Sequence, residues 1–191
     1  MFKPLKLIFS LALTFAGLGL FGNGLYIGGK AILAQVLMER AWSKTATSGD
    51  VQLPWSWMDA YPAAKLSLEG EKASHIVLNT DSGQALAFGP AIVRGTENTD
   101  MLAIAAHKNT HFQNLKTLVV GKTIKLERPK GEVLTYKVTH SQILDSRIEG
   151  LAIEADAKTP SRLALVTCYP FNAVSFNGPL RYVVYAERIE T

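Results

Sequence analysis

The sequence predicts a mainly β domain, either a closed barrel or a sandwich, that follows an N-terminal membrane-spanning helix. Three observations support this. An uncharged apolar run lies near the N-terminus, short β-branched and apolar runs separated by turn residues fill the chain after residue 60, and few later segments are long enough for a helix. With 191 residues, the chain has room for one ordinary domain beside the apolar segment.

The N-terminal segment has the length of a membrane span. Residues 7–29 carry no charge, and these 23 residues are enough helix to cross a hydrocarbon core about 30 Å thick. Lys3 and Lys6 precede the run, so the positive-inside bias leaves Met1 in the cytoplasm and places the rest of the chain outside the inner (cytoplasmic) membrane. A cleaved signal peptide and a buried core helix are the alternatives. Apolar residues that continue past residue 29 favour a retained anchor.

We expect four parts along the chain: a cytoplasmic tail (1–6), a transmembrane anchor (7–29), a helical extension and linker (30–60), and a folded domain (61–191). Within the third part, Ala31–Trp42 contains strong helix formers, whereas Ser43–Gln52 is rich in Ser, Thr, Lys and Gly and is typical of a tether.

The folded domain contains seven clear strand candidates, which are Lys65–Leu68, Ala73–Leu78, Met101–Ala106, Thr123–Glu127, Val133–Ile143, Arg162–Val166 and Arg181–Glu187. The candidates Thr123–Glu127 and Val133–Ile143 flank the turn residues Pro129–Gly131, so we expect a hairpin there. Asp81–Gly83 indicates another turn, and the apolar residues of 111–118 recur at helical spacing, which predicts one short helix.

Cys168 is the single cysteine, and it ends an apolar strand. One cysteine excludes an internal disulfide and leaves the thiol free to react. A side chain at a strand end is held by a rigid sheet and is still open to a cleft, which suits a nucleophile. The alternative is a small buried hydrophobic residue, the commonest environment of a free cysteine.

Two further strand ends carry groups that complement a thiol. His107 follows an apolar strand, and an imidazole beside a thiol favours the thiolate and donates a proton to a leaving amine. Arg181 begins a third strand 13 positions beyond Cys168, so an antiparallel return brings the guanidinium near the thiol. There its charge would stabilise an oxyanion. Rim or surface positions with only structural roles are the alternatives for both residues.

Together these motifs resemble the sortases, and specifically their Gram-negative-type class. The resemblance spans about Lys65 to Glu187 and rests on Leu165-Val166-Thr167-Cys168, on His107 in Ala-His-Lys-Asn-Thr-His-Phe, and on Arg181 in Leu-Arg-Tyr-Val-Val-Tyr-Ala. Many relatives have Gly-His-Arg where this chain has Ala106-His107-Lys108, and the position four before the cysteine is Ala164 rather than Thr.

The resemblance implies a closed β-barrel with short helices and a membrane-anchored cysteine transpeptidase. Such an enzyme cleaves a C-terminal sorting motif of secreted proteins, holds the acyl group as a Cys168 thioester and passes it to an amine, with His107 as acid and base and Arg181 at the oxyanion. Thr167 and Asn109 are expected to contact substrate or to support the catalytic residues. No metal or organic cofactor is implied, and the catalytic domain is placed on the extracytoplasmic, or periplasmic, side.

Two other functions compete with this one. His107, His111 and Cys168 would make a zinc site if both histidines shared a helical face. A non-enzymatic, membrane-tethered β domain would act as a scaffold in the cell envelope. Nucleic-acid binding is not expected, because Lys and Arg are scattered among acids despite the formal charge of +4. The segment Asp145–Pro160 is our candidate for a wall of the substrate site, on its position alone.

Overall fold

The computed structural model describes residues 3–151, 161–173 and 178–189. The chain divides into two compact units, Met1–Leu37 and Met38–Thr191. Helix α1 (Lys3–Ser48) crosses the boundary between them.

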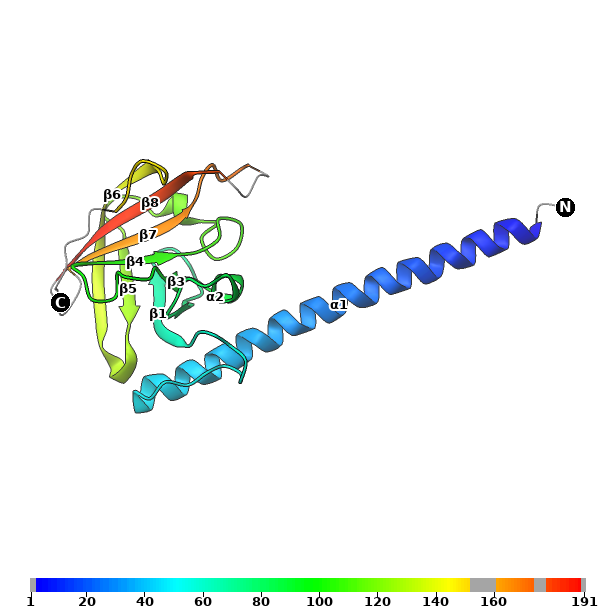
Figure 1. The fold of residues 1–191 in the computed structure, drawn as a ribbon, viewed down its shortest axis with the longest axis horizontal. Helices are drawn as coiled ribbons and strands as arrows, with labels where there is room; N and C mark the ends of the chain where they lie inside the picture. The colour runs from blue at the N-terminus through cyan, green and yellow to red at the C-terminus, as the bar shows by residue number, and fades with distance from the viewer. Residues whose placement is uncertain (1–2, 152–160, 174–177, 190–191) are drawn as a thin grey trace. The chain divides into compact units, whose positions relative to one another are not determined.

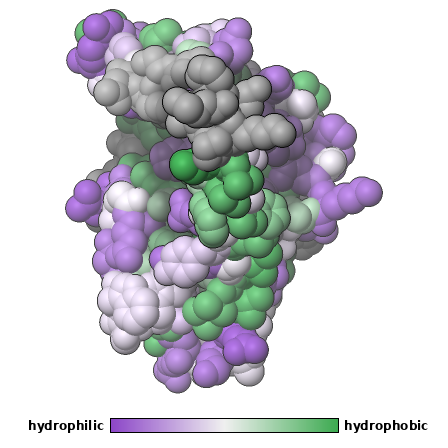
Figure 2. Space-filling model, turned by 90° about the vertical axis from the view of Figure 1, so that its right-hand side faces the viewer, coloured by the Kyte–Doolittle hydropathy of each residue, from purple (hydrophilic) through white to green (hydrophobic). Residues whose placement is uncertain are grey.

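Helix α1 has 46 residues and is therefore about 69 Å long, more than twice the thickness of a bilayer core. From Leu7 onward it is long and apolar enough to cross a membrane. Its large hydrophobic side chains are exposed along the first unit, and they form the green band of Figure 2. The expected anchor and helical extension are thus parts of one continuous helix, which could span a membrane.

The last part of α1 packs as part of the second unit. Met38, Ala41, Trp42 and Thr45 are all buried, at the spacing of one helical face. Met38 joins a hydrophobic cluster that includes Met58 and residues of the barrel. The prediction of a tether at 43–52 is therefore wrong as far as Ser48, because burial of this face stabilises a helix whose composition alone would not.

The second unit is built around a closed barrel of eight strands within the described residues (Figure 1). The strands are β1 (Pro62–Leu68), β2 (His75–Leu78), β3 (Ala91–Ile92), β4 (Met101–Ala105), β5 (Thr123–Glu127), β6 (Val133–Asp145), β7 (Arg162–Cys168) and β8 (Leu180–Arg188). Around the barrel they follow the order β1-β2-β3-β4-β7-β8-β6-β5. The predicted barrel and the β5–β6 hairpin are confirmed.

Short helices connect the strands: α2 (Gly83–Phe88), η1 (Leu115–Thr117) and η2 (Pro129–Gly131). The turn predicted at 81–83 leads into α2, whose first turn is capped by the Ser82 hydroxyl, 3.0 Å from the amide of Ala85. The helix predicted at 111–118 is wrong apart from the 3₁₀ turn η1. Its apolar residues recur because all of them reach the core, not because the backbone is helical.

Alternation along the strands separates the inside of the barrel from its outside. On β7, Leu163 and Leu165 belong to the main core, whereas Ala164 and Val166 belong to a separate outer cluster. Because side chains alternate along a strand, Thr167 points into the barrel and Cys168 points to its outer face. This alternation decides which residues near the site are accessible.

Beside the barrel, His111 lies in a group of ionisable side chains. Its ring meets the ring of His75 edge-on, with centroids 5.8 Å apart, and His75 Nε2 lies 2.8 Å from the Glu71 carboxylate. Burial lowers the pKa of His111, and the charges of His75 and His107 lower this pKa further. A hydrogen bond with the Phe88 carbonyl opposes the shift.

We predict that His111 makes the folded protein sensitive to acid. Because its pKa is lower when folded, the unfolded chain binds the proton first, and the free energy of unfolding falls as the pH drops below about 6.5. Replacing His111→Gln removes this proton uptake. Chemical denaturation of the full chain in detergent at pH 7 and at pH 5 should show a smaller loss of stability in the variant than in the wild type.

The matched control is Gln113→Ala, which changes an exposed side chain of the same turn and removes no titratable group. This control should lose as much stability between the two pH values as the wild type does. An equal loss in His111→Gln would contradict the assignment to His111.

Candidate active site

The parallel pairing of β4 with β7 sets the position of the candidate site. Met101 pairs with Arg162 and Ala105 with Val166, so both strands end at the same edge of the barrel. The Ala106 amide continues the ladder, 3.1 Å from the carbonyl of Val166. His107 is therefore the next residue beside the end of β7, where Cys168 lies.

The return strand β8 brings Arg181 to the same edge. Cys168 and Arg181 are direct register partners in the antiparallel β7–β8 pair. Side chains of such partners share a face of the sheet, with Cβ atoms about 5 Å apart. The structure thus brings the predicted thiol and guanidinium together, and both point to the outer face of the barrel.

The outer face also receives His107. Leu102, Ile104 and Ala106 belong to the barrel core, so alternation turns the next side chain outward. His107 is exposed and Cys168 is half-buried. The thiol, imidazole and guanidinium come from three neighbouring strands or strand ends, and each has access to solvent at one rim.

Arg181 is held at this rim by its own loop. Its Nη1 atom donates to the carbonyls of Gly178, at 2.7 Å, and Leu180, at 2.9 Å. The Leu180 carbonyl also accepts the amide of Tyr169, the residue after the cysteine, at 3.0 Å. These bonds fix one nitrogen of the guanidinium, and its other donors are Nε and Nη2.

Thr167 and Asn109, the two further residues expected at the site, have different environments. The buried Thr167 hydroxyl donates to the carbonyl of Ala106 at 2.7 Å, which joins the residue before Cys168 to the residue before His107. Asn109 is exposed in the turn after His107.

Sequence reasoning missed Lys108. Its side chain is buried with 6% exposure, and its ammonium donates to the carbonyls of Pro170 and Ala173, each at 2.7 Å. Both acceptors lie in the loop that follows Cys168. A lysine is rarely buried, so residue type and the exposed turn around it gave no signal of this contact.

The geometry does not support the zinc alternative. That alternative requires His107 and His111 on one helical face, whereas residues 108–114 form turns. Within the part of the chain that the structure describes, no three His, Cys, Asp or Glu side chains are grouped as metal ligands.

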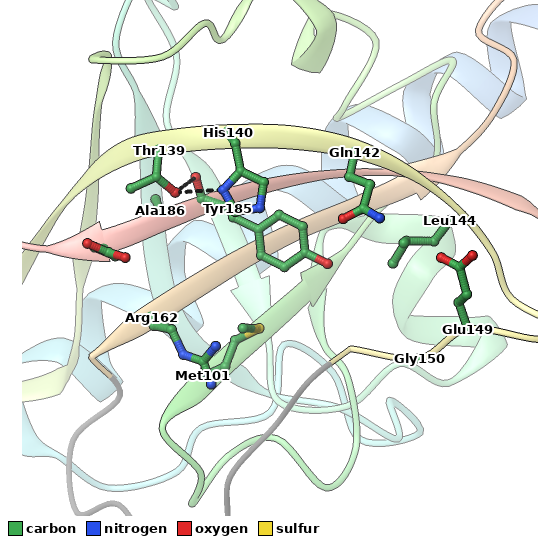
Figure 3. A pocket seen from close by; sticks show the side chains of 11 residues that line it. Met101, Thr139, His140, Gln142, Leu144, Glu149, Gly150, Arg162, Tyr185 and Ala186 are labelled. Atoms are coloured by element: carbon green, nitrogen blue, oxygen red, sulfur yellow. Dashed lines mark hydrogen bonds between the residues drawn. The ribbon is translucent and has the colours of Figure 1, made fainter.

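A separate pocket of about 420 Å³ lies on the outside of the barrel, over β6 and β8 (Figure 3). His140 stacks on Tyr185 there with centroids 4.5 Å apart, and Glu149 and Arg162 lie at its border. Its lining residues include none of the three rim groups. The candidate substrate wall at 145–160 contributes Glu149 and Gly150 to this pocket, and its residues 152–160 lie outside the described residues.

Comparison with known proteins agrees with this architecture. Residues 66–189 match the family model described as "Sortase domain". No curated protein matches the chain.

Solved sortases of several classes share the fold. Sortase A from Corynebacterium diphtheriae is 16% identical, with a TM-score of 0.58 over 83% of this chain and 85% of that one. The sortase D5 transpeptidase from Clostridium perfringens is 18% identical, with a TM-score of 0.62 over 83% and 99%. The sortase C from Clostridium perfringens, solved with the C-terminal cell wall sorting motif, is 18% identical, with a TM-score of 0.58 over 85% and 91%.

The family model covers well over half of the chain, and it includes the barrel from the second half of β1 to β8 together with the rim that carries Cys168, His107 and Arg181. The match of the family model is independent of the geometry described above, and it agrees with the resemblance to sortases in the sequence motifs. The chain therefore belongs to the sortase family.

Proposed function

We propose that this sortase is a membrane-anchored cysteine transpeptidase whose catalytic residues are Cys168, His107 and Arg181. The observation that carries the proposal is the register of three strands. Cys168 faces Arg181 across β7 and β8, and the β4–β7 ladder leads His107 to the same rim. Membership of the sortase family supports transpeptidation as the reaction.

In the first half-reaction the Cys168 thiolate attacks the carbonyl carbon of a peptide bond in the substrate. A bond forms between sulfur and carbon, and the carbon–nitrogen bond breaks. Protonated His107 donates its proton to the leaving amine, because an amine anion is too basic to depart. The acyl group remains on Cys168 as a thioester.

In the second half-reaction an acceptor amine attacks the thioester. Neutral His107 takes a proton from the amine, the sulfur–carbon bond breaks, and the thiolate is restored as a new peptide bond forms. No oxidant, reductant or nucleotide enters either step. The half-buried position of Cys168 suits both steps, since substrate and acceptor approach from solvent.

Arg181 acts on the charge that develops in both steps. As the sulfur or the amine adds to the carbonyl, negative charge builds on the carbonyl oxygen, and a guanidinium placed beside it stabilises the transition state more than the substrate. The bonds from Nη1 to Gly178 and Leu180 restrict how far the side chain turns, so the guanidinium is positioned before the substrate arrives.

The N-terminal helix serves as the anchor in this proposal. Lys3 and Lys6 stay in the cytoplasm, residues 7–29 cross the cytoplasmic membrane, and the domain from residue 61 lies on the extracytoplasmic side. Secreted proteins that carry a C-terminal sorting motif meet the enzyme there. The proposed substrate class agrees with the sortase C of similar fold, which was solved with such a motif.

The proposed function predicts a covalent intermediate on Cys168. The full chain in detergent, incubated with a library of randomised pentapeptides, should gain the mass of an acyl group on Cys168, and hydroxylamine should then remove this mass as the hydroxamate. Intact-mass measurement detects both changes. Cys168→Ala should gain no mass while keeping the same circular dichroism spectrum.

If wild type forms no adduct and folded Cys168 also resists iodoacetamide, the transpeptidase proposal is wrong. In that case Cys168 is a buried packing residue, and the envelope-scaffold function takes the place of the enzyme.

The proposed function also predicts that Arg181 is needed for turnover. Arg181→Ala should lower kcat with the peptide selected from the library by about 10² to 10³, as expected for loss of a group that stabilises an oxyanion. Iodoacetamide creates no oxyanion, so its rate with Cys168 should change by less than about threefold. The matched control Arg188→Ala removes an exposed arginine from the same strand and should keep wild-type kcat. Equal kcat in the two variants would exclude Arg181 from the oxyanion site.

A further inference from the structure

Lys108 occupies an unusual environment for a lysine. It directly follows His107 in sequence, and its side chain is almost fully buried. A buried ammonium loses hydration, so it persists only where acceptors replace the lost water. Here the carbonyls of Pro170 and Ala173 do so, both at 2.7 Å. Hydrogen bonds from a charged donor are stronger than those from neutral donors.

The two acceptors define the shape of the loop after the cysteine. Pro170 and Ala173 are the ends of a turn, because the Ala173 amide also donates to the Pro170 carbonyl at 3.3 Å. The ammonium therefore binds both ends of one turn. This turn begins two residues after Cys168, so a shift of the turn would also move Cys168 at the end of β7.

A second hydrogen bond, on the inside of the barrel, joins the ends of β4 and β7. The Thr167 hydroxyl donates to the Ala106 carbonyl at 2.7 Å. The residues before His107 and Cys168 are thus joined to each other, while the residue after His107 is joined to the loop after Cys168. His107 and Cys168 lie between these two cross-links.

Aromatic rings also pack against this loop. Phe171 and Tyr182 meet with centroids 5.3 Å apart, and both pack against the barrel core. Tyr169 meets Phe171 at 6.1 Å. These contacts hold the loop to β8, which carries Arg181, and the Lys116 ammonium lies over the Phe171 ring at 5.8 Å from its centroid. Lys108 supplies hydrogen bonds from the residue next to His107 to this loop.

We propose that Lys108 is a positioning residue: its buried ammonium fixes the distance between His107 and Cys168 by binding the loop that follows the nucleophile. This inference rests on the proposed transpeptidation. Proton transfer to the leaving amine requires the imidazole within hydrogen-bond reach, and a displacement of about 1 Å costs on the order of 10²-fold in rate. The attack of the Cys168 sulfur on a carbonyl carbon depends less on the position of His107 than the proton transfer does.

The test uses two acyl donors with the full chain in detergent. The peptide selected from the randomised pentapeptide library releases an amine, which must receive a proton from His107. p-Nitrophenyl acetate releases nitrophenolate, which departs without a proton. Single-turnover acylation is measured with both donors for wild type, Lys108→Met, Lys108→Arg and the control Lys125→Met, which neutralises an exposed lysine on β5.

Lys108→Met should lower the rate constant of peptide acylation by about 10- to 100-fold at unchanged amplitude. Its rate with p-nitrophenyl acetate should change by less than about threefold. Lys108→Arg keeps a charged donor and should recover most of the peptide rate, and Lys125→Met should match wild type with both donors.

Other results would overturn the inference. A lower amplitude with unchanged rate constants in Lys108→Met would show that the lysine only keeps the protein folded. Equal rate losses with both donors, or no loss with either, would show that Lys108 does not align His107. If wild type itself is acylated by no peptide, the proposed function fails, and the inference fails with it.

Discussion

Parallel pairing between β4 and β7 is the constraint on which the candidate site depends. Parallel strands end at the same edge of a sheet, so the residues that follow β4 meet the end of β7 although Ala106 and Thr167 are 61 positions apart. An antiparallel arrangement of these strands would place His107 and Cys168 at opposite rims. The β5–β6 hairpin lies in the long connection between the two strands, and it completes the far side of the barrel.

Strand pairing places His107, Cys168 and Arg181 at one edge of the barrel, and the loops next to the strands fix the side chains around them. Alternation turns Cys168 outward while Thr167 remains inside, so the same dipeptide offers a thiol to solvent and a hydrogen bond to the barrel. Arg181 is held by carbonyls of its own loop. Lys108 is held by the loop after the cysteine. Backbone carbonyls therefore accept the hydrogen bonds of both cations, and among the described residues no acidic side chain forms an ion pair with either of them.

Much of the barrel could be predicted from the sequence because its strands are short apolar runs bounded by turn residues, as in the β5–β6 hairpin. The strand-end positions of Cys168 and His107 and the antiparallel return to Arg181 followed from the same reasoning. Contacts set by tertiary packing could not be predicted in this way. The end of α1 is helical because one face is buried in the second unit, and Lys108 is buried because two distant carbonyls accept its protons. Neither fact is encoded in local residue preference.

The order of strands around the barrel also governs when the site comes into existence. β8 is the last of the eight strands in sequence, yet it lies between β7 and β6 and carries Arg181. Before β8 is added, β7 and β6 are open edges, the sheet has no closure, and the cysteine has no guanidinium opposite it. A chain that lacks β8 therefore keeps His107 near Cys168, through the β4–β7 pair, but has no guanidinium at the rim. Adding β8 therefore pairs both of these edges and brings Arg181 opposite Cys168 in the same step.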